Sequence, residues 1–512
     1  MNARFFLCFL MMGCGEETAG VAQDPDAGGV DAHLQEPDAA RSDAARSDSA
    51  PDATPAEPDA ALPDAALPPP PLPALIGPAL ATDLNPDPGV LEVELSAGTM
   101  RHHLGEQLDV DGMAYNGQGP GPTLQARVGD EIVVHFTNDL DEPTTIHWHG
   151  MRISDAMDGS PRIQDPVAPG ETFTYRFTAP EAGTFWYHPH VRAHAQVELG
   201  LYGVVVVHEA ELPAFTAERI LVLDDILLDG DRVAPFLRSH MEVMHGRSGN
   251  VLLTNGVVEP APGEAAEGDV ERWRLVNTAN ARTMSLSIEG ASFRVIGTDA
   301  GLLTDPYETD RIQLVVGQRY DVEVRYDRPG TVRLLSHVLV LQGENVVEQP
   351  FVVQTVEVSA TGRAPMSVAL PAVPRPTRGR TDETVTFTFD SVPDPVTGMR
   401  WEINGQDGGD DSGHDHPEPL FTFTQGDYVR MVLDNKAGPE HPFHLHGQFF
   451  EILPDGRPET EQPGLKDTVL VPGESRVTIF ARLDNPGRWM AHCHILEHAA
   501  LGMMAEILVA PR

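Results

Sequence analysis

One order of turn and strand signals occurs three times along this chain, and it limits the folds that the chain can adopt. In the first copy, Asn116-Gly117 precedes Gly129-Asp130, and Asn138 follows this Asp by eight residues. The same signals, again with eight residues from Asp to Asn, recur between Asn255 and Asn277 and between Asn404 and Asn435. Self-similarity of this kind indicates one structural unit used repeatedly. We therefore predict three homologous domains.

The stretches between these signals have the composition of β-strands. From Leu75 onward, short β-branched and aromatic runs such as Glu131-Ile132-Val133-Val134 are separated by Gly, Pro, Asn and Asp. Such runs, with few helical periods between them, are typical of β-sandwich domains. We expect an all-β protein with domains at residues 75–208, 209–358 and 359–512.

The residues before this region predict an export segment and a tether. Arg4 and the mostly apolar run after it resemble a bacterial signal, and Gly13-Cys14 resembles a lipobox, although Cys14 could also be a chance residue. Residues 15–74 are rich in Asp, Ala and Pro and poor in large apolar side chains, which favours disorder. We expect residues 1–14 to direct export and Cys14 to carry a lipid. The protein would then lie in the periplasm or at the cell surface. We also expect it to be a monomer.

Charge and cysteine content exclude other classes. The formal net charge of −42 argues against a nucleic-acid partner, which would need basic patches. The three cysteines, Cys8, Cys14 and Cys493, do not form the pattern of a disulfide framework.

The third cysteine lies in a stretch rich in metal-ligating side chains. Cys493 stands between His492 and His494, and His498 and Met503 follow closely. If the stretch is a strand, the two flanking histidines point to one face and Cys493 points to the other. A Cys and two His with a weak axial Met form a one-electron blue-copper site, and His441 is available as the second imidazole.

Four His-x-His pairs occupy corresponding positions in the first and third copies. His147-Trp148-His149 begins nine residues after Asn138, and His444-Leu445-His446 begins nine residues after Asn435. The other two pairs, His188 with His190 and His492 with His494, have equal offsets from Gly183 and Gly487; the middle copy has mostly apolar residues at the matching positions (Leu286, Ile288, Leu335 and His337). The middle copy is therefore expected to be structural.

Eight imidazoles at these positions predict a compact metal cluster. Residues i and i+2 of a strand lie roughly 6–7 Å apart, which suits one imidazole on each of two neighbouring ions. Shared among three copper ions, the eight would leave positions open for dioxygen or water. A zinc cluster fits less well, because zinc carries no electrons and would not require the link through Cys493.

Taken together, the four histidine motifs and the segment from His492 to Met503 resemble the copper motifs of three-domain, laccase-like bacterial multicopper oxidases, over roughly residues 80–510. The resemblance implies three cupredoxin-like Greek-key β-sandwich domains, with a copper cluster between the first and third. It also implies four copper ions: type 1 at His441, Cys493, His498 and Met503; type 2 at His147 and His444; and a type 3 pair at His149, His188, His190, His446, His492 and His494.

The activity implied by this resemblance is that of a copper-dependent oxidoreductase with dioxygen as acceptor. A small-molecule or metal-ion reductant, such as a phenol, an aromatic amine or a low-valent metal, would be oxidised one electron at a time at type 1. Cys493 with His492 and His494 would carry the electrons to the cluster, where dioxygen is reduced to water. Asp158 matches the family's proton-relay Asp, although a turn Asp before Gly159 is an equally good interpretation.

Three alternatives remain. A cuprous oxidase for copper tolerance is disfavoured because Gln406 to His416 and Ala437 to Glu440 contain no Met cluster. A copper nitrite reductase would need no type 3 pair. A copper-binding envelope protein without turnover would not need so complete a ligand set.

Other residues depart from the family pattern or stand outside it. Ala499 follows the type 1 His where many bacterial members have a second acid. His414 and His416 lie in an acidic insertion that could hold a metal ion but is more simply a solvated loop. His240, Met241, Met244 and His245 could bind Cu(I), but we expect them to pack against a neighbouring domain.

Overall fold

The structure is a computed structural model that describes residues 70–342, 345–409, 418–455 and 462–512. The export segment, nearly all of the tether, and His414 and His416 therefore lie outside the described residues. Within the described residues, six larger sheets form three β-sandwich units, which are called the first, middle and third units below. The prediction of an all-β chain with three sandwich domains is confirmed.

The first unit packs two four-stranded sheets together. Its strands are β2 (Val90–Gly105), β3 (Leu108–Tyr115), β4 (Leu124–Arg127), β5 (Glu131–Asn138), β6 (His147–His149), β7 (Thr172–Thr178), β8 (Gly183–His188) and β9 (Gly203–His208). They are ordered β3-β2-β5-β7 and β4-β9-β8-β6. A 3-10 helix, η1 (Asp155–Met157), follows β6.

The middle unit has a seven-stranded and a five-stranded sheet. The first holds β1 (Leu75–Ile76), β10 (Ala217–Ile226), β13 (Val251–Thr254), β15 (Val270–Asn277), β17 (Ser292–Thr298), β18 (Gly301–Glu308) and β20 (Arg319–Arg325). The second holds β14 (Gly263–Ala266), β16 (Met284–Glu289), β19 (Ile312–Leu314), β21 (Gly330–Gln342) and β22 (Asn345–Ser359). Between β10 and β13 in the sequence, β11 (Leu228–Asp229) and β12 (Arg232–Val233) form a separate two-stranded sheet. β1 pairs in parallel with β10, so Leu75 and Ile76 belong to the middle unit's sheet although they precede the first unit.

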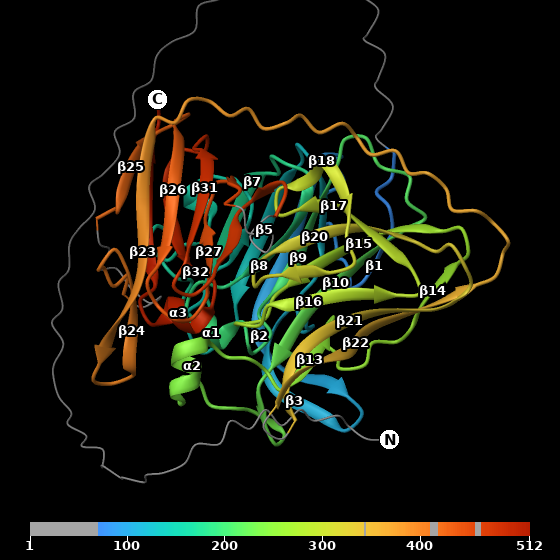
Figure 1. The fold of residues 1–512 in the computed structure, drawn as a ribbon, viewed down its shortest axis with the longest axis horizontal. Coiled ribbons are helices and arrows are strands. Elements are labelled where there is room, and N and C mark those ends of the chain that lie inside the picture. Colours follow the sequence, from blue (N-terminus) through green and yellow to red (C-terminus); the bar gives the residue numbers. More distant parts are fainter. Residues whose placement is uncertain (1–69, 343–344, 410–417, 456–461) are drawn as a thin grey trace, which may run out of the picture. The chain divides into compact units, whose positions relative to one another are not determined.

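The third unit has a six-stranded and a five-stranded sheet. The first holds β23 (Glu383–Asp394), β24 (Gly398–Ile403), β26 (Tyr428–Asn435), β28 (Phe450–Ile452), β29 (Leu465–Lys466) and β31 (Arg476–Arg482). The second holds β25 (Phe421–Thr424), β27 (His441–Leu445), β30 (Thr468–Val471), β32 (Gly487–Cys493) and β33 (Met504–Ala510). Figure 1 shows β23, β26 and β31 side by side in this unit.

The repeated turn signals have the same geometry in all three units. Each Asn-Gly pair has positive φ at both residues, for example 52° at Asn116 and 66° at Gly117, as a type I′ turn requires. Each of the three strand-ending Asn side chains donates hydrogen bonds to backbone carbonyls: Asn138 to Glu142 and Val167, Asn277 to Arg282 and Leu314, and Asn435 to Pro439, Val471 and Pro472. The sequence repeat is therefore a structural repeat as well.

Strand alternation builds a separate core in each unit. In β2, Val93, Leu95 and Ala97 are buried while Glu94 is exposed. Apolar clusters fill the first, middle and third sandwiches around Trp148, Trp273 and Trp489 respectively. Burial of these faces, at about 25 cal/mol per Å² of apolar surface, is the main stabilising contribution.

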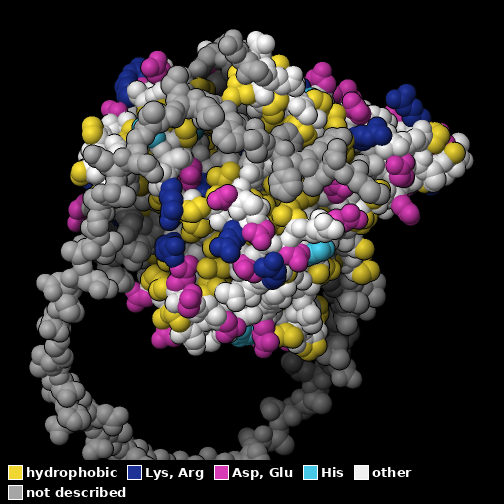
Figure 2. All heavy atoms as spheres, turned by 90° about the horizontal axis from the view of Figure 1, so that it is seen from below, with side chains coloured by type: hydrophobic (Ala, Val, Ile, Leu, Met, Phe, Trp, Pro, Cys, Tyr) yellow, Lys and Arg dark blue, Asp and Glu magenta, His cyan; other side chains and the backbone are white. Residues whose placement is uncertain are grey.

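Three short helices lie together at one place in the fold. They are α1 (Ala193–Gln196), α2 (His240–His245) and α3 (Leu496–Ala500), one from each unit, and α3 contacts both of the others (Figure 1). None of the described helices is long and apolar enough to cross a bilayer. On the face shown in Figure 2, acidic side chains are interspersed with Lys and Arg.

Candidate metal centres

Four strands bring the His-x-His pairs to one place. In the first unit β6 pairs antiparallel with β8, and His147 lies opposite His188. In the third unit β27 pairs antiparallel with β32, and His444 lies opposite His492. The second histidine of each His-x-His pair lies at the end of its strand or just beyond it. We call the set the histidine cluster: His147, His149, His188, His190, His444, His446, His492 and His494.

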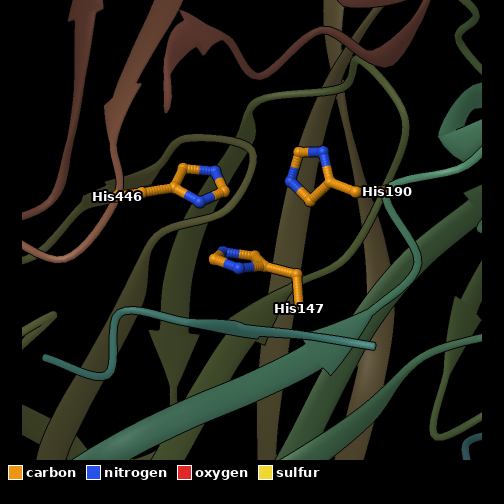
Figure 3. Close-up of side chains that lie close together, drawn as sticks. All are labelled: His147, His190 and His446. Carbon is orange, nitrogen blue, oxygen red and sulfur yellow. The ribbon is translucent and has the colours of Figure 1, made fainter. Parts of the chain in front are cut away.

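Rings from the first and third units stack on each other in this cluster. The ring centroids of His147 and His446 are 3.9 Å apart, and those of His149 and His444 are 3.8 Å apart. Figure 3 shows His147, His190 and His446 with their rings close together, and His190 lies 4.9 Å from each of the other two. The histidine cluster therefore lies where the first unit meets the third.

Most of these rings present a nitrogen that has no protein partner. The unpartnered buried atoms are Nε2 of His147, His188, His190 and His444, Nδ1 of His149, and both ring nitrogens of His494. A buried polar atom without a partner is costly, and such atoms at one place indicate a ligand. Several imidazoles lie close enough to share an ion, as His147, His190 and His446 do. The histidine cluster thus fits the copper expected from the sequence.

Burial also sets the protonation of these rings. It lowers the pKa of His188, His190, His446 and His494 well below the ordinary value and that of His492 to about 3. Neighbouring imidazoles lower these pKa values further. These five rings are therefore neutral near pH 7, which is the form that binds metal.

A second group of candidate ligands lies inside the third unit. Sγ of Cys493 is 3.6 Å from Nδ1 of both His441 and His498, and the two Nδ1 atoms are 3.1 Å apart. Met503 is fully buried in the same apolar core as Cys493, and its carbonyl accepts the backbone N–H of Cys493 at 3.1 Å. We call these four residues the cysteine centre. Three soft or borderline donor atoms facing one another fit copper.

Burial raises the pKa of the Cys493 thiol, and the carboxylates of Glu497 and Glu440 raise it further. A thiolate at this position therefore needs a compensating positive charge, which a bound metal ion supplies.

Strand alternation joins the two centres. Cys493 points into the third unit's core, while the rings of His492 and His494 join the histidine cluster. The alternation expected from the sequence is therefore present, and one covalent bond on each side of Cys493 separates it from a cluster residue.

The second nitrogen of most cluster rings is held by a protein acceptor. Nδ1 of His147 and His444 lies 2.9 Å from the carbonyl oxygens of Asp158 and Asp467 respectively. Nδ1 of His446 lies 2.7 Å from Oδ2 of Asp158. Acceptors of this kind fix the tautomer and leave the opposite nitrogen free for a metal. Asp158, which the sequence proposes as a proton relay, is thus buried against the cluster.

Comparison with known proteins agrees with this geometry. Family models described as multicopper oxidase match residues 98–212, 227–335 and 382–512. Multicopper oxidase MmcO of Mycobacterium tuberculosis is 31% identical over 451 residues, covering 78% of this chain and 83% of that protein. The chain belongs to the multicopper oxidase family.

Other proteins that resemble this multicopper oxidase are named as a laccase or described as a metallo-oxidase. Laccase-1 of Botryotinia fuckeliana is 29% identical over 463 residues, covering 78% of this chain and 80% of that one. A solved multicopper oxidase from Campylobacter jejuni, described as a metallo-oxidase, is 26% identical with a TM-score of 0.74, covering 86% of this chain and 96% of that chain. Family membership makes this protein a copper-dependent oxidoreductase that uses dioxygen.

Sequence reasoning missed one acid of this multicopper oxidase. Asp467 is buried, and its Oδ1 lies 3.2 Å from Nε2 of His149 and accepts the Thr468 hydroxyl at 2.9 Å. Arg319 holds the pKa of Asp467 well below its ordinary value, against the effect of burial. The only signal was a charged pair, Lys466-Asp467, in front of the apolar run of β30.

The expectation that the His and Met side chains of α2 pack against a neighbouring domain is wrong for most of them. His240, Met241 and His245 are exposed, and Met244 is half-buried. Val243 is the buried residue of this helix, and its carbonyl accepts the indole N–H of Trp401 in the third unit. The helix therefore docks through Val243 and its backbone, which leaves the other side chains at the surface.

At the position where many bacterial family members have a second acid, Ala499 is buried and packs with Met490 and Met504. No proton donor is available from this side chain.

Proposed function

We propose that this multicopper oxidase has laccase-like activity. Phenols, aromatic amines or low-valent metal ions would be oxidised one electron at a time, and dioxygen would be reduced to water. Copper at the cysteine centre would accept the electrons, and copper in the histidine cluster would deliver them to dioxygen.

The position of Cys493 is the observation that carries this proposal. Its sulfur faces two imidazole nitrogens at 3.6 Å, and its neighbours His492 and His494 belong to the other centre. A structural metal site would not need two ligand sets joined by covalent neighbours.

The geometry supports a particular ligand assignment. His441, Cys493, His498 and Met503 would hold the type 1 ion, and His147 with His444 would hold type 2. The type 3 pair would be held by the remaining cluster residues: His149, His188, His190, His446, His492 and His494. This assignment needs four ions in all, and the free nitrogens of the cluster support it.

Asp158 is the proposed source of protons. It is buried, its Oδ2 bonds Nδ1 of His446, and its Oδ1 lies 3.3 Å from Nδ1 of His147. A buried carboxyl between two rings of the cluster could hand a proton to a neighbouring water.

The similar proteins include both a laccase and a metallo-oxidase. They support oxidation of small reductants but do not distinguish aromatic reductants from metal ions. We favour aromatic reductants, because no Met cluster precedes His441 in the segment Ala437 to Glu440. Cuprous oxidation is the second candidate, since Met241 is exposed on α2 and α2 contacts α3, which carries His498.

We also propose export, with lipid attachment at Cys14, and a monomeric state. The apolar run before Gly13-Cys14 supports the first two. The mass of the N-terminal peptide of the mature protein would test export and lipid attachment. The molecular mass of the protein in solution would test the monomeric state.

Oxygen uptake by the copper-loaded protein with a phenol, a dye and Cu(I) tests the activity. Uptake with the phenol and the dye is the expected result. Oxygen uptake with Cu(I) but not with the phenol or the dye would favour a cuprous oxidase. No uptake with any of the three would favour a copper-binding protein without turnover.

A Cys493→Ser variant tests the division between the two centres. We expect it to lose the blue colour and the oxidation of reductant, since the type 1 ion needs the thiolate. Copper in the histidine cluster should largely remain, which metal analysis measures. Loss of all copper would contradict two separate centres.

A further inference from the structure

A turn of the middle unit reaches the histidine cluster, although this unit carries none of the cluster's histidines. A Cβ at Gly317 would lie 2.9 Å from Cδ2 of His494 and 3.1 Å from Cε1 of His149, and φ at Gly317 is 81°. Only a residue without a side chain can approach the rings so closely in this conformation. The middle unit is therefore part of the cluster's wall.

Two residues after this glycine, Arg319 uses all of its N–H groups inside the protein. It is fully buried, and it donates to both carboxylate oxygens of Asp467, at 2.9 and 2.6 Å. Its other donors reach the carbonyls of Thr184, Gly317 and Asp299, at 3.0, 3.0 and 2.9 Å. These partners come from all three units, so the guanidinium is held from three sides of the junction between them.

The carboxylate held by this pairing in turn orients cluster rings. Oδ1 of Asp467 lies 3.2 Å from Nε2 of His149 and 3.6 Å from Nδ1 of His444. His149 therefore differs from His147, His188 and His444, whose Nδ1 atoms are held and whose Nε2 atoms are free. In His149 the held nitrogen is Nε2, and Nδ1 is buried without a partner.

Space around this pair is tightly limited. A Cβ at Gly150, directly after His149, would lie 2.3 Å from Nη2 of Arg319 and 2.7 Å from Oδ2 of Asp467. The bidentate pair therefore packs against the backbone of the residue that follows the ligand, which limits any movement of the ring.

We propose that Arg319 of the middle unit is a positioning residue for the histidine cluster. It fixes the Asp467 carboxylate, which selects the His149 tautomer that has Nδ1 free for metal and steadies His444. The proposal rests on the proposed function, in which His149 and His444 are copper ligands. Residues that orient ligands in this way typically contribute roughly 10- to 100-fold to metal affinity.

Arg319→Lys tests the proposal in the full-length, copper-loaded protein. Lysine keeps the charge but lacks the planar fork that binds both carboxylate oxygens. We expect cluster copper to bind roughly 10-fold more weakly or worse, with a changed type 2 electron paramagnetic resonance signal. The blue absorption of the cysteine centre should be unchanged, because Arg319 does not touch it. Asp467→Asn, which removes the carboxylate from the same place, should reproduce the effect.

Arg272→Lys is the matched control. Arg272 is also fully buried in the middle unit, and it pairs with Asp321 and Glu209 rather than with Asp467. This variant should lower the thermal stability of the copper-free protein but leave the type 2 signal and the copper content unchanged.

Two results would overturn the proposal: wild-type copper affinity and type 2 signal in both Arg319→Lys and Asp467→Asn, or equal copper loss in the Arg272 control. Failure of the wild-type protein itself to hold cluster copper would instead contradict the proposed function. The copper content of the unmodified protein therefore separates the two.

Discussion

Single residues determine which nitrogen is free in most of the cluster imidazoles. Backbone carbonyls hold His188 and His492, and Asp158 and Asp467 hold several of the others. These acceptors lie next to a ligand in sequence or on loops that follow it. The tautomers of the held rings are therefore set in the folded protein before any metal binds.

Asp158 should be needed for dioxygen reduction but not for oxidation of the reductant. In Asp158→Asn an oxygen still faces His446, but the side chain can no longer release a proton. We expect turnover with dioxygen to fall roughly 100-fold or more. Anaerobic bleaching of the blue colour by a phenol should keep its rate, since Asp158 does not touch the cysteine centre.

Asp155→Asn is the control for this prediction. Asp155 begins the short helix η1, which ends directly before Asp158, but its carboxylate accepts the backbone N–H of Arg488 instead of facing the cluster. Equal loss of turnover in both variants would indicate a general effect on this segment and contradict a proton-relay role.

At the scale of elements, strand ends place the candidate ligands. Each unit has a strand that closes at an Asn, and in the first and third units the loop after it leads directly into β6 or β27. The Asn side chain fixes the start of this loop by donating to backbone carbonyls. The middle unit keeps the same Asn at 277, although none of its described residues joins a group of candidate metal ligands, which indicates that the Asn serves the fold.

Asn277→Ala should therefore destabilise the protein without changing its copper. Its side chain is buried and bonds the carbonyls of Arg282 and Leu314, and two unsatisfied acceptors cost about 2–4 kcal/mol. Denaturant unfolding of the copper-free protein measures the loss. Asn345→Ala at an exposed position of the same unit should change stability by less than about 0.5 kcal/mol. An equal effect at both positions would contradict the argument.

At the scale of the whole molecule, buried charges join the three units. Arg247 of the middle unit donates to Glu198 of the first at 2.8 Å, and its backbone N–H donates to Glu497 of the third at 2.9 Å. Arg319 makes a similar three-way junction at the histidine cluster. The relative positions of the ligand-bearing units thus depend on residues that bind no metal.

Arg247→Met should lower the stability of the copper-free protein by about 3–5 kcal/mol, because it leaves Glu198 buried without its cation. Thermal unfolding measures the change. The exposed pair of Arg101 and Asp111 is the control, and Arg101→Met should cost at most about 1 kcal/mol. Equal losses would show that burial of the pair is unimportant.

Asp224 makes stability depend on pH. Burial raises its pKa to about 7, although the hydroxyl of Tyr202 donates to it at 2.6 Å. Because the folded protein binds this proton more tightly than the unfolded chain, Asp224 stabilises the fold most below pH 3.8, and this contribution is lost as pH rises to about 7. The difference in unfolding free energy between wild type and Asp224→Asn, measured from pH 4 to 8, should show this fall. A difference independent of pH would contradict it.

Much of the protein could be predicted from short-range spacing. Asn-Gly turns, Gly-Asp turns and alternating apolar residues act over a few residues, so three sandwich units were predictable from Asn138, Asn277 and Asn435 and their surroundings. Equal offsets of the histidine pairs from these signals marked the cluster residues for the same reason, because a ligand's place on a strand depends on its distance from the turn.

Contacts between distant segments had to come from the folded protein. Arg319 and Asp467 are 148 residues apart, and no local pattern relates a guanidinium in one sandwich to a carboxylate in another. The same holds for the exposed side chains of α2 and for the place of β1 in the middle sheet. Local spacing sets each strand and the direction of its side chains, whereas packing of the units against one another sets which buried charges meet at the histidines.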